Sequence, residues 1–392
     1  MFMNPLRQYH PAVPAPASFA SRLLLCLALP AFVSCADYGG QQGFLGLLAG
    51  VGGVGSSPVE SITQVPTTVI TASPATVAVA AVDLSRSFVL CSQTAGSSRP
   101  NNFVTCQLSA ADQVTIETFD PNNQRIALSI VQFASGAFVQ RGSTTLGAGD
   151  SQVDIALSAV NLSQTFAIVT NRINTTNTTL DSHREVAPLL VDASTLRLAR
   201  GATGTAVIIE WQVIELGAAS VQSGTAAIVD GSTSTTAAVA PFDPAKSFVL
   251  QHTTADASVL GKENSLYVRN VPDAGSSVQF FRSHSTGTVS VHYFLVSMLD
   301  LSTVQRGTHA FDAAYTNTPV LTAGLTAVDT NRAIALASAD IQQPGNLGST
   351  SDQDSGKIRT ALQSGTLIEV ERGSAESPRT GTINWQVVEF SN

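Results

Sequence analysis

A strand-like segment occurs twice in the chain, and its repetition constrains the fold more than any other feature. IIEWQVIEL at 208–216 returns as INWQVVEF at 383–390, and the two copies hold the only two Trp residues among 392. The motif VQRG occurs at 139–142 and 304–307, with VQSG at 221–224 between them. These starts follow one another in steps of 82 and 83 residues, so the chain contains an internal repeat of about 83 residues.

A second marker runs in phase with the first. VDLSRSFVL, VNLSQTFAIV, FDPAKSFVL and VDTNRAIAL align an acidic or amide residue in each copy, namely Asp83, Asn161, Asp243 and Asp329. An Asp or Asn about four residues before a strand can accept hydrogen bonds from backbone N–H groups, so we expect these side chains to cap turns. The markers divide the chain into four units, at 61–138, 139–220, 221–303 and 304–392.

The four units fall into two alternating types. Units 2 and 4 carry Trp211 and Trp385 and share the segments TLRLARG and TLIEVERG. Units 1 and 3 have Ser129 and Tyr293 near the Trp position. The order A–B–A′–B′ therefore indicates that an A–B pair was duplicated.

Each unit reads as a set of short strands. Runs rich in Val, Ile, Thr and Phe are separated by Gly, Pro, Asn and Asp, and no unit contains a convincing amphipathic helix of 12 residues. Six or seven strands in about 83 residues predict an all-β chain of four tandem antiparallel β-sandwich repeats.

Alternation predicts that each Trp lies in the core of its unit. Trp211 shares a strand face with Ile209 and Val213, and Trp385 shares the matching face with Ile383 and Val387. If the units fold independently, Trp211→Ala should unfold unit 2 and Trp385→Ala should unfold unit 4.

The N-terminus predicts export. The apolar run 23–33 is too short to span a bilayer and suits a signal peptide covering 1–34. The following FVSCAD allows lipidation of Cys35 after cleavage before it, or an ordinary cut after Ala36. A Gly-rich tether at 35–60 would then join an outer-membrane or cell-surface anchor to the repeats; without lipidation the protein would be secreted.

Two cysteines remain beyond this leader. Cys91 and Cys106 flank a polar loop, and in an oxidising compartment a disulfide between them is the favoured interpretation. Two free buried thiols are the alternative.

Motifs for catalysis are absent from the sequence. It contains no G-x-S-x-G, no P-loop and no H-E-x-x-H. His252, His284 and His292 share unit 3 and could converge on a metal, although isolated histidines more often form simple hydrogen bonds. Asp352 and Asp354 resemble part of a calcium loop but lack its remaining acidic ligands. We therefore expect no enzyme activity and no cofactor, and the net charge of −8 argues against nucleic-acid partners.

The repeated pattern of VQRG, SFVL, TL-x-RG and I-x-W-Q-V-V-E-F resembles tandem β-sandwich repeats of uncharacterised bacterial surface lipoproteins and phage tail-associated proteins. The resemblance covers 61–392. The architecture is also distantly similar to H-type lectin domains, which are six-stranded sandwiches that bind sugars and oligomerise; no sugar-contacting residue can be carried over from that family. Together these features predict a non-enzymatic lipoprotein with a structural or adhesive role, or alternatively a lectin-like protein that binds surface glycans.

Lipidation has a direct test. Metabolic labelling with a palmitate analogue should tag the full chain and should not tag Cys35→Ser, because the thioether-forming side chain is gone. Equal labelling of both proteins would exclude Cys35 as the attachment point.

Overall fold

The computed structural model is all-β, as the sequence predicts. It describes residues 58–391 apart from 95–102, 122, 174–182, 184, 257–265, 274, 301, 312–319, 323, 343–356 and 373–379. Within these residues 24 strands form eight three-stranded antiparallel sheets, and no α-helix occurs among them. The expected signal peptide and Cys35 lie outside the described residues, as does the tether up to residue 57.

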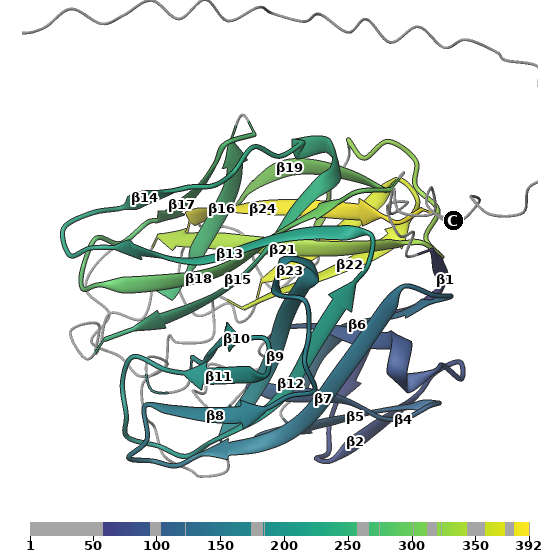
Figure 1. Cartoon of the computed structure of the whole chain (residues 1–392), viewed down its shortest axis with the longest axis horizontal. Helices are drawn as coiled ribbons and strands as arrows, with labels where there is room; N and C mark the ends of the chain where they lie inside the picture. The colour runs from purple at the N-terminus through teal and green to yellow at the C-terminus, as the bar shows by residue number, and fades with distance from the viewer. Residues whose placement is uncertain are drawn as a thin grey trace, which may run out of the picture. The chain divides into compact units, whose positions relative to one another are not determined.

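Each unit contributes six strands (Figure 1). Unit 1 contains β1 Val59–Ile70, β2 Ala75–Ala78, β3 Ser87–Thr94, β4 Val104–Ala110, β5 Gln113–Thr118 and β6 Gln124–Phe133. Unit 2 contains β7 Ala137–Leu146, β8 Gln152–Ala156, β9 Thr165–Ile173, β10 Ala187–Asp192, β11 Thr195–Ala199 and β12 Val207–Leu216. Unit 3 contains β13 Ala219–Ile228, β14 Ser234–Ala238, β15 Ser247–Ala255, β16 Val268–Asp273, β17 Ser277–Arg282 and β18 Val289–Met298. Unit 4 contains β19 Thr303–Phe311, β20 Val320–Thr322, β21 Ala333–Gln342, β22 Ile358–Ser364, β23 Leu367–Arg372 and β24 Thr380–Glu389.

The same topology recurs in every unit. The first, sixth and third strands form one sheet, with the sixth in the middle, and the second, fifth and fourth strands form the other, with the fifth in the middle. Short 3-10 turns precede the third strands of the first three units, at η1 Leu84–Arg86, η2 Leu162–Gln164 and η4 Pro244–Lys246. The first strands begin one or two residues ahead of the unit starts expected from the repeats.

Both Trp residues are buried, as alternation predicts. Trp211 is 9% exposed and Trp385 is 5% exposed, and each shares its strand face with fully buried neighbours, namely Ile209 and Val213 in β12 and Ile383 and Val387 in β24. The pairing register places Leu128, and not Ser129, at the corresponding position of unit 1, because Leu128 lies three residues before Val131 as Trp211 lies three before Ile214.

The glycine of the VQRG motif makes room for the aromatic ring. Gly142 pairs with Trp211, Gly224 with Tyr293 and Gly307 with Trp385 across neighbouring strands. A Cβ atom on Gly142 would lie 2.6 Å from Cζ2 of Trp211, well inside van der Waals contact. Only a residue without a side chain allows the indole to lie across the strand here.

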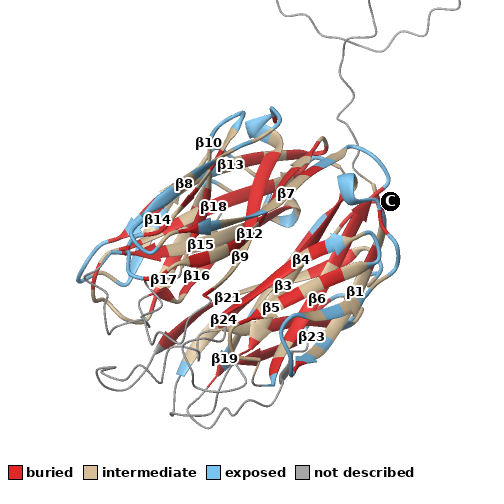
Figure 2. Ribbon diagram, turned by 90° about the horizontal axis from the view of Figure 1, so that it is seen from below, coloured by how far each residue is buried: buried red, intermediate tan, exposed pale blue. Residues whose placement is uncertain are grey.

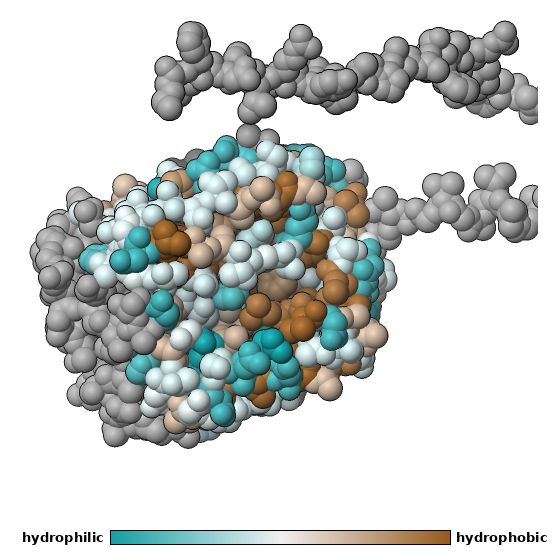
Figure 3. All heavy atoms as spheres, turned by 60° about the vertical axis from the view of Figure 1, so that its left-hand side comes forward, coloured by the Kyte–Doolittle hydropathy of each residue, from teal (hydrophilic) through white to brown (hydrophobic). Residues whose placement is uncertain are grey.

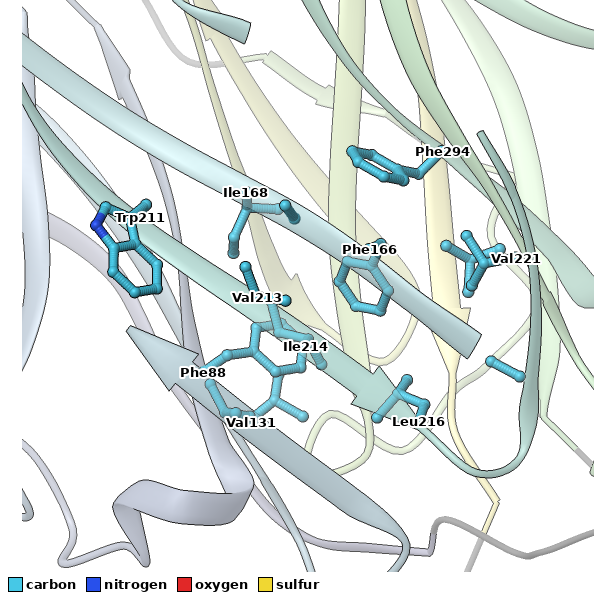
Figure 4. Packing of buried hydrophobic residues seen from close by; sticks show 14 of the residues in the cluster. Phe88, Val131, Phe166, Ile168, Trp211, Val213, Ile214, Leu216, Val221 and Phe294 are labelled. Carbon is cyan, nitrogen blue, oxygen red and sulfur yellow. The ribbon is translucent and has the colours of Figure 1, made fainter. Parts of the chain in front are cut away.

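The sixth strands are buried on both faces (Figure 2). One face packs inside the unit, and the other joins an apolar cluster to which all four units contribute. Figure 4 shows part of this cluster, with residues of units 1, 2 and 3 labelled. A chain of phenylalanines runs through that cluster, with ring centroids 5.6–6.3 Å apart. In order of contact these are Phe390, Phe133, Phe88, Phe166 and Phe248.

This shared cluster changes one expectation. Independent unfolding of unit 2 or unit 4 requires that each unit keep its own core, but Trp211 and the Phe166 ring belong to the same cluster as Phe88, Phe248 and Phe390. Loss of one unit would expose apolar surface of its neighbours. We therefore expect the four units to unfold together.

Overpacking at the glycine should reveal this cooperativity. Gly142→Ala forces the new methyl group into the Trp211 ring, so it should cost about 1–3 kcal/mol and lower the temperature of a single transition. Gly149→Ala is the matched control, because its Cβ would meet nothing within 4 Å. Differential scanning calorimetry measures both; two separated transitions in Gly142→Ala would contradict shared unfolding.

Candidate functional site: the loop end and the seams

The two ends of unit 1 carry different kinds of connection. Val59, the first residue of β1, pairs with Phe133, and Ser87, which follows the 3-10 turn, pairs with Gln132. The chain therefore enters unit 1 at the same end of the sheet as the 3-10 turn. Thr94, the last residue of β3, pairs with Arg125 at the opposite end of the sheet. We call the first end the turn end and the second the loop end, because segment 95–102 follows Thr94.

Neighbouring units are joined by a recurring contact near their loop ends. We use the word seam for the place where the fourth strand of one unit packs on the third and sixth strands of the next. At seam 1–2 the backbone N–H of Cys106 donates to Oγ1 of Thr170 at 3.0 Å. The N–H of Asn270 donates to Oγ of Ser338 at 3.1 Å at seam 3–4, and that of Thr360 donates to Oγ of Ser92 at 3.0 Å at seam 4–1.

These contacts close a cycle, because the fourth unit packs on the first. Val59 N also donates to Ser391 O at 3.3 Å, which places the C-terminal end of the described chain beside β1 (Figure 1). The seam contacts lie at the ends of the third strands and the starts of the fourth strands. The bases of the four segments that differ most between units therefore lie on one end of the cycle; the segments themselves, at 95–102, 174–182, 257–265 and 343–356, fall outside the described residues.

Two buried arginines organise the loop end. Arg200 donates to five backbone carbonyls around the end of β11, those of Asp150, His183, Thr205, Gly147 and Ala148. Arg282 does the same at the end of β17, with Ser232, Thr286, Val229, Ser285 and Gly287. The guanidinium of Arg200 ties three loops of unit 2 together, and that of Arg282 ties two loops of unit 3 together. Arg200 belongs to the segment TLRLARG that unit 2 shares with unit 4, but the sequence predicted no role for its arginine. Arg282 of unit 3 was not predicted either, because only the arginine of that segment is retained there.

The turn end is capped as the sequence predicts. Asp83, Asn161, Asp243 and Asp329 each accept a backbone N–H two residues ahead, at 2.9–3.1 Å. The hydroxyl of Ser85 and its N–H hold the pKa of Asp83 below its usual value, and the N–H of Asn331 and the Arg332 guanidinium do so for Asp329. These side chains are therefore engaged in turn structure.

An amide clamp joins the B-type units to the A-type units. Gln212 of β12 accepts from Val89 N at 2.9 Å and donates to Val89 O at 2.8 Å, so its side chain occupies the free edge of β3. Gln386 of β24 makes the same pair of bonds to Val249 on the edge of β15, at 3.0 Å each. An edge strand presents unpaired backbone groups, and the clamp satisfies one residue of each.

The ion pairs at seams 1–2 and 3–4, which lie within the two A–B pairs, have opposite polarity. At seam 1–2 Arg172 of unit 2 pairs with Glu117 of unit 1. At seam 3–4 the acid belongs to unit 4, where Asp340 accepts from Nε of Arg269 at 2.8 Å. Seam 4–1 is closed by a buried network in which Glu371 meets both Arg359 at 2.7 Å and Arg125 at 2.6 Å.

Two seams contain a cavity of about 160 Å³ in the same place. The cavity at seam 3–4 is lined by Asn270, Arg306, Asn384 and Gln386 among others, and burial lowers the pKa of Arg306 to about 10. The corresponding cavity at seam 2–3 is lined by Pro188, Leu190, Thr225, His292 and Phe294 among others. The seams are therefore the recessed, side-chain-lined places of the described structure, although each cavity is small.

The structure brings together some of the remaining candidate residues from the sequence and separates others. Cys91 and Cys106 form a disulfide between β3 and β4 with their Cα atoms 6.3 Å apart. His252 and His292 pair across β15 and β18, whereas His284 lies beyond β17 and contacts Thr286 N. In the described part of the chain no group of three or more His, Cys, Asp or Glu side chains could hold a metal ion. Asp352 and Asp354 lie outside the described residues.

No protein-family model matches the chain, and no curated protein matches it. Among the described residues, no helix has the length and apolar character to cross a membrane.

The amide clamp can be tested by removing it. Gln212→Ala leaves the N–H and C=O of Val89 buried without their partner, at a cost of about 1–3 kcal/mol. Gln152→Ala, an exposed change in the same unit, should stay within about 0.5 kcal/mol of the parent chain. Urea denaturation measures both; equal midpoints for the two variants would show that the clamp does not stabilise the seam.

Proposed function

We propose that this chain is an exported, membrane-anchored surface protein with no enzymatic activity, whose loop end binds a partner in a structural or adhesive role. One observation carries the proposal: the four most variable segments leave from one end of a closed cycle of units. Residue 58, where the N-terminal part of the chain joins β1, lies at the opposite end. An anchor on the turn end would therefore point the loop end away from the membrane.

The contrast between framework and loops supports binding. The strands and caps recur from unit to unit, whereas segments such as SQTAGSSRPNN and SADIQQPGNLGSTSDQDSGK differ in length and in sequence. Binding residues are found preferentially on loops that a rigid scaffold positions. The seam contacts and the buried side chains of Arg200 and Arg282 supply such a scaffold, because they fix the bases of these loops.

The outer surface fits a protein that is exposed to water. Large hydrophobic side chains with substantial exposure are few in the described chain, namely Val69, Leu84, Phe138, Leu162, Val191, Val229 and Leu299. On the face shown in Figure 3, apolar residues lie in several groups between polar ones. A surface of this kind leaves the segments at the loop end as the best candidates for specific recognition.

Carbohydrate binding is the second candidate. The cavity at seam 3–4 is lined by amide and guanidinium side chains, which are groups that recognise sugar hydroxyls, and six-stranded sandwiches of the H-type lectins bind sugars. The two Trp side chains are enclosed within their units, so a sugar would have to be held without them as stacking platforms.

Surface display can be measured with an epitope tag. A tag inserted in segment 343–356 of the full chain should be labelled by antibody on intact cells, because the loop end faces away from the anchor. The matched control places the same tag in the β4–β5 hairpin at Asp112, which lies at the turn end. Labelling of the first tag only after permeabilisation would contradict surface display, and stronger labelling of the control on intact cells would contradict the orientation.

A glycan array separates the two binding classes. The purified chain from residue 36 onward should bind no glycan if the partner is a protein, whereas a lectin-like protein would bind a related set of glycans. Where a glycan binds, Asn384→Ala should abolish binding if the cavity at seam 3–4 holds the sugar, and shortening of segment 343–356 should abolish it if the loops do. Binding that survives both changes would exclude both sites.

A further inference from the structure

Among the described residues, seam 2–3 lacks the equivalent of the N–H to hydroxyl bond that recurs at the other three seams. The residues that pair with Ile116, Leu198, Phe280 and Val370 occupy equivalent places in the fourth strands, and they are Cys106, Pro188, Asn270 and Thr360. Three of them donate a backbone N–H across their seam. Pro188 has no N–H, and so it cannot.

The acceptor of that bond is replaced as well. Ser92, Thr170 and Ser338 supply a hydroxyl at the equivalent place in the third strands, and the register puts His252 there in unit 3. The amide clamp is absent here as it is at seam 4–1, since Phe294 and Ser129 stand where Gln212 and Gln386 stand in the B-type units. Ser223 stands in place of Arg141, Arg306 and the Gln64 of unit 1, each of which donates to a carbonyl of the preceding unit.

Two histidines replace these contacts. His252 and His292 pair across β15 and β18, on the face that β10 of unit 2 covers. The ring nitrogens of His292 lie 3.0 Å from Oγ1 of Thr225 and 3.1 Å from Oγ1 of Thr254. Nearby walls of the cavity come from Pro188, Leu190 and Phe294, which offer no counter-charge to an imidazolium.

We propose that seam 2–3 is an acid-labile joint, which opens at low pH while the other three seams stay closed. Opening would separate unit 2 from unit 3 midway along the chain and would expose the apolar walls of the cavity. The joint lies between the two A–B pairs, so each pair keeps its own clamp, ion pair and N–H to hydroxyl bond.

The protonation equilibria give the direction of the effect. Burial lowers the pKa of His252 to about 4, with a further contribution from the charge of His292, and burial also lowers the pKa of His292 to about 4. In an opened seam both imidazoles would return towards the usual value of about 6.5. The opened state therefore binds more protons as the pH falls below about 6.5, and opening becomes easier until the pH reaches about 4.

Other charged groups around the joint do not offset the effect of histidine protonation on opening. Titratable residues on the strands packed at the seam are Asp192 on β10, Arg172 on β9, Tyr293 on β18 and, in the second sheet of unit 3, Arg269 and Asp273 on β16. Asp192 is bonded to Ser194 at the turn end, Arg172 pairs with Glu117, and Arg269 pairs with Asp340. Glu185 precedes β10 and Asp256 follows β15, and neither is among the groups that shift the pKa of His252.

Amide hydrogen exchange of the full chain, read by mass spectrometry at about pH 7.5 and about pH 4.5, tests the joint. After correction for the intrinsic pH dependence of exchange, protection of β10 and β15 should fall by at least about tenfold, because each imidazole alone favours opening by more than that. Protection of β4, β16 and β22 at the other seams should change by less than about twofold. A uniform loss of protection at all four seams, or none at β10 and β15, would overturn the proposal.

The other seams supply the matched variants. Pro188→Thr with His252→Ser copies Thr360 and Ser92 of seam 4–1, and His292→Asn copies Asn384 of seam 3–4. The double change removes the His252 imidazole and His292→Asn removes the other, so each should reduce the acid response by about the share of one histidine, and His292→Asn tests this even if the double variant fails to fold. His309→Gln, a change on β19 of unit 4, should leave the response intact. An unchanged acid response in His292→Asn and in the folded double variant would show that the histidines are not responsible.

Discussion

The apolar cluster between the four units is the contact on which the rest of the structure depends. A β-sandwich normally buries one face of each sheet and leaves the other face to water. Here the sheets of the first, sixth and third strands also bury their second face, against the same sheets of the other units. This explains why the sixth strands carry buried residues on both faces, as Val213 and Ile214 of β12 show, and why even the amide side chain of Gln212 is buried there.

Each residue of the VQRG motif that revealed the repeat has its own structural role. Its Val enters the shared cluster, and its Gly lies under the aromatic ring of the sixth strand. Its Gln makes two bonds to the backbone before the 3-10 turn, as Gln140 does to Ser158 at 2.7 and 2.8 Å. Its Arg reaches the preceding unit, where Arg141 donates to Leu84 O at 2.6 Å and also contacts Ser87 O. The motif therefore recurs because one short strand serves two units at once.

The sequence was sufficient to predict the features that depend on local pattern. The all-β class, the six-stranded units, the buried Trp side chains and the capped turns follow from period, propensity and the spacing of repeats. The seams could not be predicted in this way. Their bonds join residues such as Gln212 and Val89, 123 positions apart, or Thr360 and Ser92, 268 positions apart. They also use Gln, Ser, Thr and Arg, which pattern alone assigns to solvent; their burial becomes visible only when the units are packed together.

Aligning the units by sequence alone also left an ambiguity of one residue, since it placed Ser129 near the Trp position. Strand pairing resolves it: Leu128 takes the inward place, and Ser129 lies on the outer face, where its hydroxyl donates to Gln64 at 2.8 Å. A one-residue shift exchanges the two faces of a strand. A similar spacing error would have hidden the equivalence of Pro188 with Cys106, Asn270 and Thr360.

Four units of one topology could close in the wrong order, and the reversed ion pairs disfavour this. Glu117 of unit 1 meets Arg172 of unit 2, while Arg269 of unit 3 meets Asp340 of unit 4. If unit 1 took the place of unit 3 beside unit 4, Glu117 would face Asp340; if unit 3 took the place of unit 1 beside unit 2, Arg269 would face Arg172. Like charges opposed in a partly buried seam are unfavourable, so each A-type unit discriminates between the two B-type units through repulsion as well as attraction. The short connections between consecutive units fix their order along the chain, and the charges at the margin of the shared apolar cluster favour the same neighbours.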